Sequence, residues 1–132
     1  MKKEEYRSDH GQGLIEFAII LPILLLLLMV IFDVGRSVYT YSVVHNAARE
    51  GARSGIIYPY DPNRAIAVAR HLTTGLDPDP ARLIITPIST TDTFEMQVSY
   101  TFTAATPYLG RLTGSPTNTI TLVGRSRMAK EH

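Results

Sequence analysis

The amino-acid sequence predicts an α+β protein in which a long N-terminal helix and a short helix pack on a small antiparallel β-sheet. Three observations lead to this prediction. Residues 17–32 are apolar without interruption, residues 34–55 lack proline and carry small side chains at helical spacing, and residues 93–103 alternate between apolar and polar side chains. Helices that lie on one face of an antiparallel sheet are typical of the α+β class.

The composition excludes several classes of function. The chain has 132 residues, about one domain, and its 13 Lys and Arg against 12 Asp and Glu give a formal charge of +1. This balance provides no basic face, so no nucleic-acid partner is expected. Because the chain has no cysteine, disulfides, thiolate nucleophiles, cysteine zinc sites and iron–sulfur clusters are excluded.

The apolar run 17–32 is predicted to be a retained membrane helix. Its 16 residues give about 24 Å of helix, so a segment that spans a hydrocarbon core of ~30 Å also takes in Glu16 and Asp33 at its rims. A buried core helix would need a larger protein around it, and a cleaved signal peptide would need a small-residue cleavage site that the sequence lacks. Pro22 is expected to kink the helix.

The flanks of this run predict its orientation. Basic residues at positions 2, 3 and 7 precede it and Arg36, Arg49 and Arg53 follow it, so the positive-inside rule weakly favours a cytoplasmic N-terminus. Export of the large C-terminal part behind a signal-anchor segment agrees with this orientation. We therefore expect residues 12–35 to anchor the chain, and residues 36–132 to form an exported domain that includes the continuation of the long helix.

The residues before the apolar run resemble the processing site of type IV pilin-like proteins. In these proteins a membrane aspartic peptidase cuts after a glycine, and here a cut after Gly11 would remove the leader 1–11 and make Gln12 the first residue and Glu16 the fifth. Glycines at 11 and 13 disfavour helix, so we expect an extended chain at the cut. Glu16 would then neutralise the new α-amino group of its own or a neighbouring subunit. The alternative is a flexible glycine hinge followed by an acid that the helix dipole favours.

Small side chains form a stripe along the second half of the predicted helix. Close approach of another helix or a sheet is the usual reason for such a stripe. Its members are Ala47, Ala48, Gly51, Ala52 and Gly55. Arg49, Glu50 and Arg53 lie on the other side, where Glu50 can pair with Arg53; they are either a solvated face or a partner contact.

Together these motifs resemble the TadE-like pseudopilin family of the tight-adherence (Tad) pilus system. The resemblance covers roughly residues 11–55 and rests on the glycine–acid processing site, the pattern E-F-A-x-x-x-P, the acid-x-Gly-Arg motif and the A-A-R-E-G-A-R helix. The matching residues are Gly11, Glu16, Phe17, Ala18, Pro22, Asp33, Gly35, Arg36 and residues 47–53. The family more often has glutamate where Asp33 stands. The remaining motif residues, Phe17, Pro22, Asp33, Gly35 and Arg36, are expected to serve helix packing.

The resemblance implies a pilin-like fold and a structural role, as a minor pilin or pseudopilin in the inner membrane and then in an extracellular pilus. Its partners would be other pilin subunits, the pilus assembly platform, the prepilin peptidase and, before assembly, membrane lipid. No cofactor and no small-molecule substrate are expected. The alternative, from a different class of function, is a permanently membrane-anchored extracytoplasmic binding module with no filament role.

The segment 56–63, which is rich in turn residues, is predicted to end the long helix and to begin a second one. Asp61 and Pro62 are the predicted N-cap and first residue of this helix, and Gly75 its stop. Its expected buried stripe contains Ala65, Ile66, Val68, Ala69 and Leu72. Residues 76–81 form a proline-stiffened connector in which Asp77 and Asp79 are either solvated or calcium ligands.

Three strands are predicted after this connector, at residues 82–88, 93–103 and 117–130, with a short helical segment at 107–114. The clearest alternation places Phe94, Met96, Val98, Tyr100 and Phe102 on one buried face, which Ile120 and Leu122 continue. The sequence leaves the strand order open.

Catalytic motifs are not found. The four histidines are scattered at positions 10, 45, 71 and 132, without the spacing of a metal site, and there is no G-x-S-x-G motif or P-loop. The sequence therefore predicts that the protein is not an enzyme.

Overall fold

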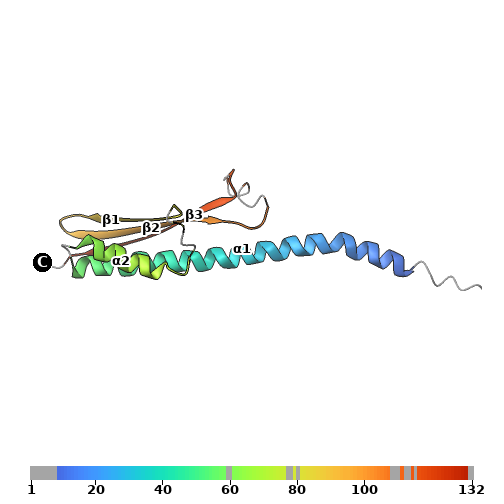
Figure 1. Ribbon diagram of the computed structural model, residues 1–132, viewed down its shortest axis with the longest axis horizontal. Coiled ribbons are helices and arrows are strands. Elements are labelled where there is room, and N and C mark those ends of the chain that lie inside the picture. Colours follow the sequence, from blue (N-terminus) through green and yellow to red (C-terminus); the bar gives the residue numbers. More distant parts are fainter. Residues whose placement is uncertain are drawn as a thin grey trace, which may run out of the picture.

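The computed structural model describes residues 9–58, 61–76, 79, 81–107, 111, 114 and 116–130. Two helices, α1 (Asp9–Ile57) and α2 (Pro62–Leu72), are followed by the strands β1 (Leu83–Ser89), β2 (Thr93–Thr103) and β3 (Thr119–Ala129). Figure 1 shows that the sheet and α2 lie along the C-terminal half of α1, whereas the N-terminal half projects away alone. The predicted pilin-like α+β architecture is therefore confirmed.

Helix α1 is one continuous helix of 49 residues, about 70 Å long, and it curves toward its N-terminal end in Figure 1. Pro22 lies inside it without ending it. The extended chain expected around Gly11 is not present, because α1 begins at Asp9 and includes both glycines. Each glycine costs only about 1 kcal/mol relative to alanine, which is too little to end a helix that the long downstream segment propagates.

Helix α2 begins as predicted, with the side chain of Asp61 accepting a hydrogen bond from the amide of Arg64 at 3.1 Å. Ala65 and Ala69 are buried, but Leu72 is 41% exposed, so its assignment to the buried stripe is wrong. The helix ends at Leu72, before the expected stop at Gly75. The next residue, Thr73, turns inward instead, and its hydroxyl donates to the carbonyl oxygens of the last helical turn.

The three strands form an antiparallel sheet in the sequential order β1-β2-β3. In the central strand β2 the expected alternation is present, with Phe94, Met96, Val98, Tyr100 and Phe102 buried. Ile120 and Leu122 of β3 are half-buried on the same side. The predicted helical segment 107–114 lies largely outside the described residues, and so does Asp77.

Close backbone contacts hold α1 against the sheet. A Cβ atom on Gly124 of β3 would lie 2.7 Å from the carbonyl oxygen of Val44, so the strand touches the main chain of the helix. On the helix, a Cβ on Gly51 would lie 3.0 Å from Cγ of Met96, and a Cβ on Gly55 would overlap the ring of Phe94. The sheet is therefore packed directly against α1, and these contacts fix its position along the helix.

Candidate functional site

The N-terminal turns of α1 carry the predicted processing and assembly residues. Gly11, Gln12 and Glu16 are all exposed, and no atom outside the helix lies within 4 Å of a Cβ built on Gly11. The amide group of Gln12 donates to the carboxylate of Glu16 at 3.3 Å, one turn later. Backbone and side chains at the predicted cut are thus accessible, although the backbone is helical.

The apolar run has no cover within the described part of the protein. Residues 17–32 are exposed apart from two half-buried positions, with Phe17 at 59%, and Pro22 is also exposed. Among the described residues α1 is the one helix that is long and apolar enough to cross a membrane. By length and composition it is suited to anchoring the chain in a bilayer.

Exposed apolar side chains continue beyond this run, into the half of α1 that packs against the sheet. Val34, Val38 and Tyr41 are 52%, 60% and 50% exposed. They follow Leu27 and Ile31 at alternating steps of four and three residues, the spacing of a helix–helix seam. We name these five residues the apolar seam. Tyr41 reaches roughly 13 Å past the last residue of the run.

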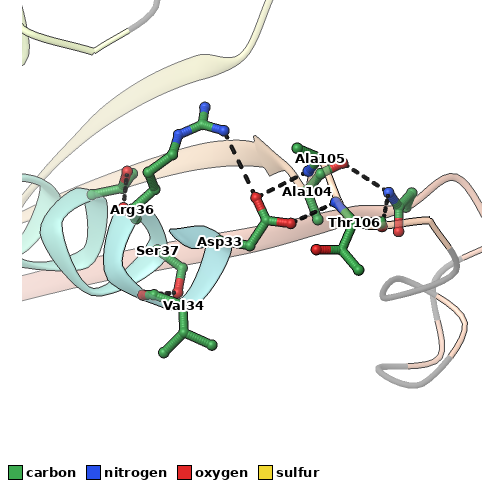
Figure 2. A network of polar contacts seen from close by, with 9 residues as sticks. Asp33, Val34, Arg36, Ser37, Ala104, Ala105 and Thr106 are labelled. Atoms are coloured by element: carbon green, nitrogen blue, oxygen red, sulfur yellow. Dashed lines mark hydrogen bonds and ion pairs between the residues drawn. The ribbon is translucent and has the colours of Figure 1, made fainter. Parts of the chain in front are cut away.

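At the junction between the projecting half of α1 and the domain, Asp33 binds the loop that follows β2. Its carboxylate oxygens accept hydrogen bonds from the backbone amides of Ala105, at 3.0 Å, and Thr106, at 2.6 Å (Figure 2). Asp33 is only 2% exposed. The side-chain amide of Asn118 donates to the carbonyl oxygens of Ala104 and Thr106, which fixes the same loop from its other end.

Arg36 lies one turn after Asp33. Its guanidinium is 3.8 Å from the Asp33 carboxylate and 5.2 Å from the centroid of the Phe102 ring. Because the Arg36 side chain is 62% exposed, solvent screens this ion pair, and the two backbone amides are the stronger partners of Asp33.

The predicted helix-packing residues fall into two groups. The stripe at Ala47, Ala48, Gly51, Ala52 and Gly55 is buried inside the domain. Gly35 is exposed with open space around it, so its backbone is available to another molecule. Arg49 and Arg53 are exposed, and Arg53 is 3.7 Å from Glu50 in the expected i,i+3 pair.

Two features of this region were missed by sequence reasoning. The partners of Asp33 lie 72 and 73 positions away, and nothing local to Asp33 identifies them. The apolar seam was detectable, because Val34, Val38 and Tyr41 continue a spacing that the apolar run conceals. Among the described residues, no three His, Cys, Asp or Glu side chains gather as metal ligands would.

Comparison with known proteins adds one finding. Residues 11–53 match the family model described as TadE-like protein. The match begins at the predicted processing glycine and ends within α1, so it includes Glu16, Asp33 and the apolar seam but not α2 or the sheet. No curated protein and no solved structure matches the chain.

Proposed function

Because residues 11–53 are a TadE-like domain, we propose that this chain is a minor pilin or pseudopilin of a Tad-type pilus that serves adhesion or secretion. The apolar seam is the observation that carries the proposal. A permanent membrane anchor explains the exposed run 17–32 but gives no reason for apolar side chains two turns beyond it. A filament subunit explains both, because the α1 helices of neighbouring subunits cover the run and the seam together.

The assembly has two stages. The chain first spans the inner membrane once, with its N-terminus in the cytoplasm and residues 36–132 exported. The prepilin peptidase then cuts between Gly11 and Gln12. Since this segment is helical, the peptidase unwinds the first turns of α1, which the low helix propensity of two glycines facilitates.

Glu16 provides the charge chemistry of the second stage. After the cut it is the fifth residue, and its carboxylate neutralises the new α-amino group within its own helix or in an adjacent subunit. Subunits leave the membrane by exchanging lipid contacts for contacts with the run and seam of their neighbours. The assembly platform of the pilus supplies the energy, and Arg49, Glu50 and Arg53 remain available on the outer side of α1.

The first test is the intact mass and N-terminal sequence of the protein from its own cell envelope, with and without the peptidase. A chain that begins at Gln12 only when the peptidase is present supports the proposal. An uncut chain refutes the processing step and favours the permanently anchored binding module.

Filament incorporation is the second test, with Glu16→Ala and Val38→Ser as variants. Both are expected to lose incorporation into sheared pilus fractions while they accumulate in the membrane like the wild type. Glu50→Ala, which removes a half-exposed carboxylate elsewhere on α1, is the matched control and is expected to assemble. Normal incorporation of both test variants would contradict the filament role.

A further inference from the structure

The two edge strands of the sheet, β1 and β3, differ in their backbone hydrogen-bonding groups. At the ends of β1, the amide of Thr101 donates to the carbonyl oxygen of Arg82 and the amide of Thr90 to that of Thr93, both at 2.9 Å. Because the register between them is continuous, the even-numbered residues of β1 bond to β2 and the odd-numbered residues point away. Pro87 is one of these odd-numbered residues, so the edge of β1 lacks a donor there, which protects it from further pairing.

The edge of β3 has no such protection. The amide of Ala104 donates to the carbonyl oxygen of Asn118 at 3.1 Å, and the amide of Lys130 to that of Asp92 at 2.8 Å. The register is continuous between these pairs, so the odd-numbered residues of β3 point away from β2. Among the described residues, the odd-numbered ones from 121 to 129 have no partner for these outward backbone groups, and none is proline. We name them the open edge: Thr121, Val123, Arg125, Arg127 and Ala129.

The side chains of the open edge are exposed and carry excess positive charge. They lie on the face of the sheet that points away from α1. Arg127 is 2.7 Å from the carboxylate of Glu95. Arg125 lies opposite the uncharged Gln97 and has no hydrogen bond or ion pair within the described part of the chain. Two arginines therefore share one carboxylate on this face of the three strands, and Arg125 is available to another.

We propose that the open edge binds an extended segment of another protein, which adds a fourth strand to the sheet and places a carboxylate beside Arg125. Hydrogen bonds to the outward amides and carbonyl oxygens provide affinity in this mode of binding, and alternate side chains provide specificity. A second copy of the chain is a poorer partner. Its β1 edge is interrupted by Pro87, and pairing of two β3 edges would gather two arginines from each copy on one face. This site goes beyond the filament role and does not depend on it.

A synthetic peptide tests the open edge, with the full chain in micelles. The peptide alternates valine with glutamate over about eight residues, the length of an ordinary strand, and its matched control has glutamine in place of glutamate. Fluorescence anisotropy is expected to show about threefold tighter binding of the glutamate peptide, which is within the range of one exposed ion pair. Arg125→Gln is expected to bring this preference near one. Arg70→Gln, which removes an exposed arginine of α2, is expected to keep it.

Amide hydrogen exchange, followed by NMR, distinguishes strand addition from simple attraction of charge. The amides of Val123 and Arg125 point outward and are expected to exchange about tenfold more slowly when the glutamate peptide is bound. The amide of Leu122, which faces β2, is the internal reference and is expected to be protected with or without the peptide.

A proline on the open edge is the second variant. Val123→Pro removes an outward donor without breaking a hydrogen bond to β2, as Pro87 does in β1, and is expected to weaken binding of the glutamate peptide about tenfold. Val123→Thr keeps the amide and is expected to bind like the wild type. Near-ultraviolet circular dichroism checks that both variants fold, and if Val123→Pro does not, Arg125→Gln and the hydrogen exchange of the wild type still decide.

Three results would overturn the open edge as a binding site. They are equal affinity of the wild type for the two peptides, unchanged exchange at Val123 and Arg125 when the peptide is bound, and an equal loss of preference in Arg70→Gln. None of these measurements involves the filament, so failure of the open edge leaves the proposed function untouched.

Discussion

Replacing Asp33 by alanine removes the acceptor of two backbone amides, the buried amide of Thr106 and the part-buried amide of Ala105. A hydrogen bond to a charged group contributes about 1.5–3 kcal/mol, and a buried amide left without a partner costs about 1–3 kcal/mol. Counting each amide once, we expect the domain to lose about 3 kcal/mol of unfolding free energy. The ion pair with Arg36 adds little, because that side chain is mostly exposed. Asp33→Asn keeps one neutral acceptor and is expected to lose about 2 kcal/mol.

Urea unfolding of the full chain in micelles measures this loss. The near-ultraviolet circular dichroism of the tyrosines reports on the domain, because the chain has no tryptophan and Tyr100 is in the core. With an m-value of about 2 kcal/mol per molar urea, the midpoint of Asp33→Ala falls by about 1.5 M. The matched control is Glu50→Gln, which breaks an i,i+3 ion pair between the side chains of Glu50 and Arg53. The urea midpoint of this variant is expected to lie within about 0.25 M of the wild-type midpoint. Equal midpoints for Asp33→Ala and this control would refute the reasoning.

Three further predictions concern the packing of the domain, each measured by the same urea unfolding. Gly124→Ala is expected to lower the free energy of unfolding by about 2 kcal/mol, because the new Cβ would clash with the carbonyl oxygen of Val44. Gly35→Ala, whose Cβ would lie in open space, is expected to be neutral or slightly stabilising. Equal effects of the two substitutions would contradict the close approach of β3 to α1. Phe94→Ala is expected to lower the free energy of unfolding by about 3–5 kcal/mol, because Phe94 is only 1% exposed. A loss below about 1 kcal/mol would show that Phe94 is not part of the core. Glu95→Gln breaks a 2.7 Å pair with a mostly exposed arginine and is expected to cost less than about 1 kcal/mol, so a larger loss would show that the pair is structural.

Much of the fold was predictable because its strongest signals are local. The alternation in β2 is uninterrupted over five buried residues, and the same strand pairs with both neighbours. Polar and apolar side chains on such a strand define its two faces without tertiary information. The end of α2 was harder to predict, because a helix of 11 residues offers little periodicity, and because Thr73 is buried where Leu72 was expected to be.

The candidate site was less predictable because its contacts join distant parts of the chain. The sequence predicts Asp33 only as an acid at the rim of a membrane segment. Its burial depends on the loop at Ala105, more than 70 residues later in the chain. Gly124 carried a usable signal, since a glycine inside a strand often marks the close approach of another backbone. The roles of Gly11 and Glu16 are inferred from the sequence motif alone, and both residues are exposed in the structure.

If the chain assembles as proposed, the apolar seam is where the free energy of assembly would arise. Moving the run 17–32 from lipid to neighbouring helices gains little, because hydrocarbon tails are as apolar as leucine side chains. Val38 and Tyr41 follow the predicted anchor 12–35, so in the membrane-anchored stage of the proposed function they would meet water or headgroups, and at least half of each side chain is exposed. Covering that half would yield about 1 kcal/mol per residue, or roughly 2 kcal/mol for the two, which is a factor of about 30 in association. Since Asp33 and the glycine contacts fix the domain along α1, this gain would depend, in the proposed filament, on the same register that is proposed to place Glu16 beside an adjacent N-terminus. In the proposed filament the seam would therefore favour a correctly staggered subunit over one that is merely embedded in the membrane.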